Sequence, residues 1–314
     1  MKFRTEINLP ESPEKISYQD KIFGLGSCFV THIQNKFDYY QFQNQINPFG
    51  TVFNPVSIRK LLQYVVNQQF FYEKDLFYHQ NLWKSFDLHS EFNNLDKEIF
   101  LNTINSKISE AGKFLKTADW LFLTFGTAWV YRHKASGNIV NNCHKVPQKE
   151  FDKFLLSPTD IVKELNKIIR LATSFNPQLK ILMSISPVRH LKNGFVENQR
   201  SKAHLITAVH QLESKIFYFP SYEILLDDLR DYRFYKDDFI HPNTLAINYI
   251  WQKFSKTFID QNAIPIMQKI EKIRQGLAHK SFNPGSPQDI NRLNKLQADI
   301  DKLQNEFTWM VFKK

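Results

Sequence analysis

The sequence predicts an α/β protein, a three-layer α/β/α sandwich with a central parallel sheet of about five strands. Short apolar runs alternate with helix-like segments along most of the 314 residues. The hydrophobic content of 42% is enough for a sizeable core, and 29 phenylalanines against 9 glycines and 13 prolines favour tight aromatic packing over disorder. Because parallel strands need crossover connections, repeated strand-helix alternation indicates a parallel sheet covered by helices on both faces.

The strands are expected where apolar runs are bounded by turn residues, at residues 21–26, 39–46, 119–125, 180–185 and 216–219. The first helix follows from Phe29, Ile33 and Phe37, which recur every fourth residue. Similar spacing and capping residues predict helices at about 55–67, 157–173, 196–212, 244–259 and 288–306, with an extension of the fourth to residue 275 left open.

The sequence predicts that the chain divides into three parts. Residues 1–20 are polar and are expected to form an arm over the surface, residues 21–280 the main domain, and residues 281–314 a helical extension. Residues 68–118, with a helix from about 95 to 111, are interpreted as an aromatic insertion, which either roofs a pocket or packs under a long connection. A hairpin is expected within a second insertion, residues 128–147.

Composition excludes several classes of protein. The net charge of +10 is not accompanied by a nucleic-acid-binding motif, so no specific nucleic-acid partner is expected. Two cysteines exclude a disulfide framework, although they leave one bridge open. No signal peptide and no run of about eighteen apolar residues is evident, so we expect a soluble cytoplasmic protein without membrane insertion.

The chemistry is expected around Ser27. The strand over 21–26 stops at Gly26-Ser27, and a helix begins at Cys28. Such a turn presents the serine hydroxyl at the edge of the sheet and at the positive end of the helix. Ser27 is therefore either a nucleophile or only a turn and helix cap.

A second segment supplies a base for this hydroxyl. His241 precedes Pro242, which disfavours helical backbone angles at the histidine. Asp238 lies three residues earlier and can accept the Nδ1 hydrogen, leaving Nε2 to take a proton from Ser27. Asp237 is an alternative partner, and a solvated capping loop is the alternative reading of the whole segment.

These segments can meet in one crevice. Ser27, Gly50, Gly126, Ser186 and the loop over 238–241 each follow the carboxyl end of a predicted strand, where ligands bind in open parallel sheets.

The blocks resemble the GSCFA-domain family, a branch of the SGNH (GDSL-like) hydrolases. The resemblance spans roughly residues 21–255. The matching blocks are Gly26-Ser27-Cys28-Phe29-Val30, Asn47-Pro48-Phe49-Gly50-Thr51, Leu123-Thr124-Phe125-Gly126-Thr127-Ala128, Asn142-Cys143-His144-Lys145, Ser186-Pro187-Val188-Arg189-His190 and Asp238-Phe239-Ile240-His241-Pro242-Asn243. The resemblance implies an SGNH-type α/β/α fold and esterase chemistry without a cofactor. It also implies that Ser27 is the nucleophile, His241 the base and Asp238 the partner of His241.

One block departs from the wider superfamily. Where that superfamily has Gly-x-Asn, whose asparagine helps to bind the oxyanion, this chain has Gly126-Thr127-Ala128. The amides of Ser27 and Gly50 are expected to remain available. A side-chain donor must then come from Thr127, Asn142 or His144, or be absent, and loss of one donor typically costs on the order of 10²- to 10³-fold in rate.

Other polar residues have two readings each. Arg189 and His190 could bind a carboxylate or a sugar hydroxyl, or Arg189 could form a surface salt bridge. Cys28 is expected to be packing rather than a nucleophile, and Cys143 with His144 has no further ligand cluster to suggest a metal site. Trp129 and Tyr131 suit stacking on a sugar or core packing.

The sequence therefore favours a metal-independent serine esterase that deacylates a small or carbohydrate ester. An O-acyltransferase using the same residues, and an inactive carbohydrate-binding protein on the same scaffold, remain as alternatives.

Overall fold

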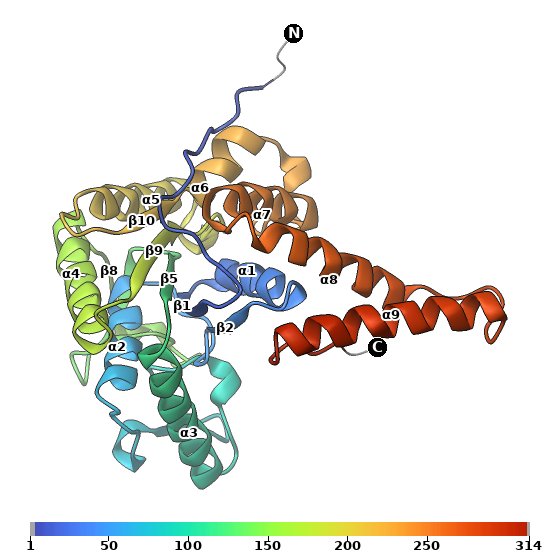
Figure 1. Ribbon diagram of the computed structural model, residues 1–314. Coiled ribbons are helices and arrows are strands. Elements are labelled where there is room, and N and C mark those ends of the chain that lie inside the picture. Colours follow the sequence, from blue (N-terminus) through green and yellow to red (C-terminus); the bar gives the residue numbers. More distant parts are fainter. Residues whose placement is uncertain (1–3, 313–314) are drawn as a thin grey trace.

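The computed structural model describes residues 4–312 and confirms the α/β fold. Its central sheet has five parallel strands in the order β10-β9-β5-β1-β2 (Figure 1). The strands are β1 (Lys21–Gly26), β2 (Gln43–Ile46), β5 (Trp120–Phe125), β9 (Lys180–Ile185) and β10 (Phe217–Phe219). Because all five run the same way, their carboxyl ends share one edge, as the sequence predicts.

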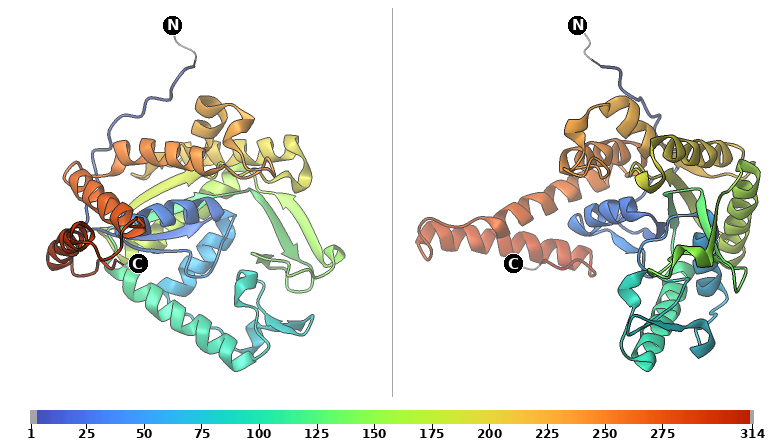
Figure 2. Two further views of the ribbon diagram at one scale, coloured as in Figure 1. Left: turned by 90° about the vertical axis from the view of Figure 1, so that its right-hand side faces the viewer. Right: turned by 180° about the vertical axis from the view of Figure 1, so that it is seen from behind.

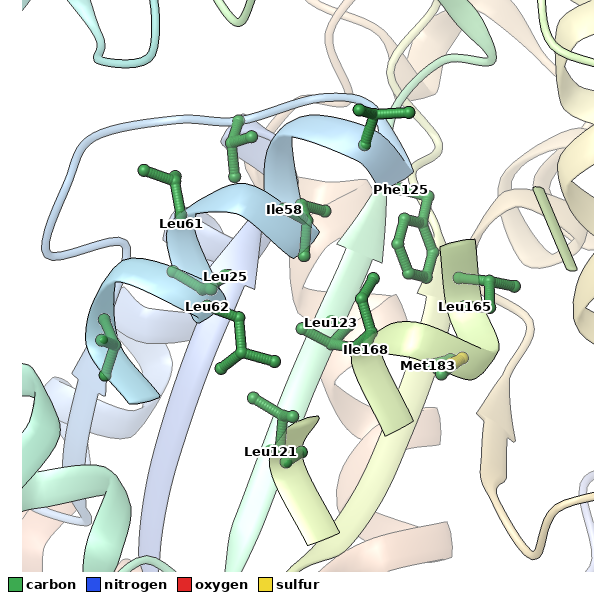
Figure 3. Packing of buried hydrophobic residues seen from close by; sticks show 14 of the residues in the cluster. Leu25, Ile58, Leu61, Leu62, Leu121, Leu123, Phe125, Leu165, Ile168 and Met183 are labelled. Carbon is green, nitrogen blue, oxygen red and sulfur yellow. The ribbon is translucent and has the colours of Figure 1, made fainter. Parts of the chain in front are cut away.

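One face of the sheet is covered by four helices. They are α2 (Pro55–Val66), α3 (Lys97–Lys116), α4 (Pro158–Phe175) and α5 (Phe195–His210). Figure 3 shows Leu62 of α2 and Ile168 of α4 packed over Leu123 of the central strand β5. Since β5 is buried on both faces, its continuous apolar sequence is the pattern of a central parallel strand.

The opposite face carries the remaining long helices. They are α1 (Cys28–Tyr39), α7 (Thr244–Phe258), α8 (Ala263–Ala278) and α9 (Pro287–Glu306). Helices α8 and α9 lie side by side and extend away from the sheet (Figure 2). Gly276 of α8 lets Leu296 of α9 approach closely, because a Cβ on this glycine would lie 2.9 Å from the leucine Cδ1.

The structure corrects several predicted boundaries. Strand β2 begins at Gln43 rather than residue 39, because α1 continues to Tyr39. The helix predicted over 244–259 is confirmed as α7, and the extension left open is a separate helix, α8, since Ile259 leaves the helix to form a parallel bridge with Ile16. That bridge and the buried side chain of Tyr18 tie part of the predicted surface arm into the core.

The first predicted insertion differs from expectation, and the hairpin in the second is confirmed. Helix α3 belongs to the main core, where its Phe100, Ile104 and Ile108 are buried, so residues 68–118 are only partly an insertion. Residues 129–133 and 139–140 form the expected antiparallel hairpin, and residues 151–155 extend it to a three-stranded sheet. The short strands are β3 (Phe77–His79), β4 (Leu82–Lys84), β6 (Trp129–His133), β7 (Ile139–Val140) and β8 (Phe151–Leu155).

Short helical turns complete the chain. They are η1 (Glu73–Asp75), η2 (Ser90–Phe92), η3 (Gln148–Glu150), η4 (Leu191–Asn193), α6 (Ser221–Glu223), the π-helix η5 (Ile224–Leu229) and η6 (Tyr232–Phe234). None of the helices within residues 4–312 combines the length and apolarity needed to cross a bilayer.

Candidate active site

Ser27 lies at the junction of β1 and α1 and caps the helix. Its Oγ accepts a hydrogen bond of 3.3 Å from the Phe29 amide and lies 3.3 Å from Thr124 Oγ1. The preceding glycine permits this turn, because a Cβ on Gly26 would lie 2.4 Å from the Thr124 carbonyl oxygen. The Ser27 side chain is fully enclosed, at 0% exposure.

Asp238 and His241 form the pair that the sequence predicts. Asp238 Oδ2 lies 2.7 Å from His241 Nδ1, and its Oδ1 accepts hydrogen bonds from the amides of Ile240 and His241. The hydrogen bonds from the His241 amide and ring lower the pKa of Asp238 well below its usual range. A carboxylate held in this way fixes the ring and directs Nε2 away from itself. Asp237 takes no part in these hydrogen bonds.

His241 and Ser27 lie at the same edge of the sheet. No hydrogen bond joins them within residues 4–312. His241 follows Ile240, whose carbonyl oxygen accepts a hydrogen bond from the Arg189 amide in the loop after β9. Burial is the main cause that lowers the pKa of two nearby histidines, His190 and His32. His32 lies on α1, the helix that Ser27 caps, and His190 lies beside Gly126.

Arg189 contacts the loop that carries His241. Its amide donates to Ile240 O at 3.2 Å, and its Nη1 donates to Phe239 O at 3.2 Å. The guanidinium also lies 4.1 Å from the centre of the Tyr235 ring. These contacts leave the substrate contact a prediction.

A cavity of about 670 Å³ opens beside the predicted site. Its lining holds two lysines, Lys145 and Lys192, and no aspartate or glutamate from the described part of the chain. Trp129 and Tyr131 contribute aromatic faces, with Lys153 Nζ at 4.9 and 5.5 Å from their ring centres. The other lining residues are Thr51, Phe53, Asn54, His89, Thr127, Val140, Asn141, Asn142, Cys143, His144, Val146, Pro147, Gln148, His190 and Asn193.

The backbone amides expected to bind an oxyanion already have acceptors. The Ser27 amide donates to Thr124 O at 3.1 Å, and the Gly50 amide donates to Asn47 O at 2.9 Å. The Gly126 amide donates to Phe53 O at 2.7 Å. The expectation that the Ser27 and Gly50 amides are free is therefore wrong for this conformation, because the Ser27 amide donates across to β5 and the Gly50 amide closes its own turn.

Two of the three expected side-chain donors are also engaged. Thr127 Oγ1 lies 3.0 Å from Ser201 Oγ and accepts from the Trp129 amide. His144 is buried, and its Nε2 lies 2.7 Å from Ser85 O. Asn142 lines the cavity, and its Oδ1 accepts from the His144 amide. Ala128 is itself buried and its amide donates to Ser201 Oγ.

His190 lies between the cavity and Ser27. Its amide donates to Asn198 Oδ1 at 2.8 Å, and its ring meets the Phe53 ring edge to face at a centroid distance of 5.4 Å. Its Nε2 is buried and has no hydrogen-bond partner among the described residues. Burial, followed by the positive charges of Lys202 and His241, lowers the pKa of His190 to about 3, so the ring is neutral.

Lys202 is a buried cation that the sequence analysis missed. It is 1% exposed, and its Nζ donates to Gly126 O and Ser186 O, each at 2.7 Å. It thereby joins the loops that follow β5 and β9. A signal was available in the sequence, because Lys202 shares its helix face with Asn198, Leu205 and Val209, at spacings of three and four residues.

The burial of Lys202 should make stability depend on pH. Burial lowers its pKa to about 7, below the value of about 10.4 for an exposed lysine, so the unfolded chain binds more protons between these values. The free energy of unfolding should therefore rise as the pH increases from 7 to 10. Denaturant titrations at both pH values should show a smaller rise in Lys202→Met than in wild type or in the exposed control Lys163→Met. An unchanged rise in Lys202→Met would contradict this assignment.

The two cysteines are free thiols, Cys28 and Cys143. Burial raises the pKa of each thiol, which disfavours the nucleophilic thiolate. Within residues 4–312, no group of three or more histidine, cysteine, aspartate or glutamate side chains is arranged to hold a metal ion.

Two solved structures show a distant likeness to the chain. One is a carbohydrate esterase family 3 protein from Talaromyces cellulolyticus, with 8% identity, coverage of 81% of this chain and 99% of the other, and a TM-score of 0.36. Another is an acetyl esterase mutant with acetate ion, with 9% identity, the same coverage and a TM-score of 0.36. At these scores neither likeness bears on function. No curated protein matches the chain.

Family models, in contrast, cover nearly the whole sequence. The model of the GSCFA family matches residues 21–254, which contain the sheet, Ser27 and His241. The model of the GSCFA domain protein C-terminal domain matches residues 270–314, which contain α9. The chain belongs to the GSCFA family.

Proposed function

We propose that this protein is a serine esterase in which Ser27 is the nucleophile, His241 the general base and Asp238 the group that orients the base. The observation that carries the proposal is the Asp238–His241 pair, joined at 2.7 Å, at the same sheet edge as a serine that caps a helix. A hydroxyl becomes an effective nucleophile when an oriented base takes its proton.

The reaction would proceed by acyl transfer through Ser27. The Oγ turns from Thr124 towards His241, gives its proton to Nε2 and attacks the ester carbonyl carbon. The tetrahedral intermediate then collapses, the carbon–alkoxy bond breaks, and His241 returns the proton to the leaving alcohol. Water, activated by the same imidazole, attacks the acyl-enzyme and releases the carboxylic acid and Ser27. Asp238 stabilises the imidazolium formed in both steps.

The enclosure of Ser27 favours a short acyl group. Its side chain has no exposed surface, and the neighbouring cavity is bounded by His190 and Phe53. An acetyl-sized group therefore suits the space beside Ser27, with the alcohol portion in the cavity. The amide, imidazole and aromatic lining of that cavity is suited to a hydroxylated alcohol such as a saccharide.

A fluorophosphonate probe tests the assignment directly. Wild-type protein should be labelled, and mass spectrometry should find the phosphonyl group on Ser27. Labelling of another residue would overturn the assignment, and absence of labelling would favour a carbohydrate-binding protein. If labelling occurs at Ser27, competition between water and an added alcohol separates hydrolysis from acyl transfer.

The lysines of the cavity predict a preference for acidic alcohols. Lys145 and Lys192 meet no acidic side chain in the described lining, so a carboxylate on the substrate would be attracted. Lys192→Gln should raise KM for an acetylated acidic oligosaccharide about two- to fivefold, the scale of one exposed ion pair. An acetylated neutral oligosaccharide should show no such rise, and Lys163→Gln, far from the cavity, serves as the control. An equal rise for both substrates would contradict the prediction.

A further inference from the structure

A buried nitrogen beside Ser27 has no partner in the resting protein. His190 Nε2 is enclosed and unpaired within residues 4–312. Buried polar groups are nearly always hydrogen-bonded, because an unpaired one loses its bonds to water without replacement. The Asn198 side chain accepts from the His190 backbone amide, and the Phe53 ring packs against the imidazole. A buried, unpaired nitrogen on a side chain packed in this way points to a partner that arrives with a ligand.

The space next to this nitrogen lies between His190 and Ser27. Gly126 lies against both groups, because a Cβ placed on it would be 2.9 Å from His190 Nε2 and 3.4 Å from Ser27 Cβ. His190 Nε2 and the serine side chain are therefore near neighbours across Gly126. A reacting carbonyl must lie close to both the nucleophile and a donor to its oxygen, and these two groups are near enough to serve one carbonyl.

We propose that His190 Nε2–H donates a hydrogen bond to the oxyanion that forms when Ser27 attacks an ester carbonyl. This inference rests on the proposed esterase function and adds to it a residue that contacts the reacting atoms. A donor positioned before reaction stabilises the developing negative charge without reorganisation, and typically speeds the reaction on the order of 10²- to 10³-fold.

The charge state of His190 suits a hydrogen-bond donor to the oxyanion better than a base for Ser27. The ring is neutral because burial and the neighbouring cations lower its pKa to about 3. A group with so low a pKa is a poor acceptor of the serine proton near neutral pH, whereas a neutral imidazole always carries one N–H. His241, paired with the Asp238 carboxylate, is the suitable base.

The other candidate donors around Ser27 support this assignment by their own contacts. The Ser27 amide donates to Thr124 O, the Gly126 amide to Phe53 O and the Gly50 amide to Asn47 O. Thr127 Oγ1 is occupied by Ser201 and the Trp129 amide. Nε2 of His190 is the polar atom near Ser27 that is left without a partner in the described residues.

Lys202 holds the loops after β5 and β9 together beside His190. Its Nζ binds the carbonyl oxygens of Gly126 and Ser186, which lie on the two loops that bring Gly126 and His190 together. Its charge also contributes to keeping His190 neutral and favours an anion in the space beside Gly126.

The first experiment compares His190→Ala with His190→Gln by the pre-steady-state burst of p-nitrophenol from p-nitrophenyl acetate. His190→Ala should slow acylation on the order of 10²- to 10³-fold, the effect of losing one oxyanion donor. His190→Gln retains an N–H donor but cannot act as a base, so it should recover a large part of the rate. His210→Gln, at the exposed end of α5, controls for the substitution itself. Wild-type rates in His190→Ala would overturn the proposal.

A second measurement uses the unsubstituted protein and does not depend on variants folding. In ¹⁵N-histidine-labelled wild type inhibited with a trifluoromethyl ketone, the His190 Nε2 proton should be visible and shifted downfield by the bound oxyanion. An unprotonated Nε2 in this adduct would overturn the proposal even if the variants are inactive.

The outcomes separate this inference from the proposed function. If wild type neither reacts with the fluorophosphonate nor hydrolyses the ester, the esterase function fails and His190 has no oxyanion to bind. If wild type reacts and His190→Ala reacts equally fast, only the role of His190 fails.

Discussion

Replacing Ser27 by alanine should lower ester hydrolysis by roughly 10⁶-fold, the scale observed when a triad nucleophile is removed. The alanine has no oxygen to form the acyl-enzyme, and the remaining groups can only position the substrate. The measurement is kcat for p-nitrophenyl acetate, together with loss of fluorophosphonate labelling. The Ser27→Ala/His241→Ala double variant should be no slower than either single variant, because the two residues act as a unit.

Cys28→Ala is the matched control for Ser27→Ala. This substitution alters the adjacent residue at the start of α1. It removes the Cys28 thiol, which is the alternative nucleophile to the Ser27 hydroxyl. Activity should persist in Cys28→Ala. Because Ser27 also caps α1, Ser27→Ala should lower the free energy of unfolding by about 0.5–2 kcal/mol, which a denaturant titration measures. Retained turnover in Ser27→Ala, or loss in Cys28→Ala alone, would contradict the assignment.

Replacing Asp238 by asparagine should lower kcat by about 10⁴-fold, as expected when an imidazole loses the carboxylate that orients it. The asparagine side chain keeps nearly the same volume but favours the wrong tautomer of His241. Circular dichroism should show an intact fold, because Asp238 lies in an exposed loop. Activity within tenfold of wild type would show that another group orients His241, with Asp237→Asn as the test of its neighbour.

The lowered pKa of Asp238 determines how its contribution to stability changes with pH. Its pKa is lowered in the folded protein by hydrogen bonds from the His241 amide and ring. The stability contributed by this pairing is therefore present above the unfolded value of about 3.9 and is lost as the pH falls through the lower folded value. Wild-type hydrolysis near neutral pH should thus reflect an ionised Asp238, and protonation of this carboxyl should not limit activity above pH 5.

Much of the fold could be predicted from local pattern. Strand β5 is a continuous apolar run and α4 has a serine cap and a regular apolar face, so both follow from the residues within them. Whether the helix over 244–259 continues to residue 275 could not, because the break depends on Ile259 pairing with Ile16, more than 240 residues away in the chain. Likewise α3 could be recognised as a helix, but only packing shows that it covers the sheet.

The candidate site also has features that follow from local sequence and features that depend on the tertiary structure. The sequence by itself determined the Asp238–His241 pair, since three residues and a following proline bring the two side chains together locally, and it determined the Gly26-Ser27 turn into α1. The tertiary structure alone decided which polar atoms are occupied and which are left unpaired. Lys202 and His190 both follow β9 in the chain and lie against Gly126, which follows β5, only when these two strands pair. Burial, which no local pattern specifies, then lowers the pKa of both side chains and leaves His190 Nε2 unpaired.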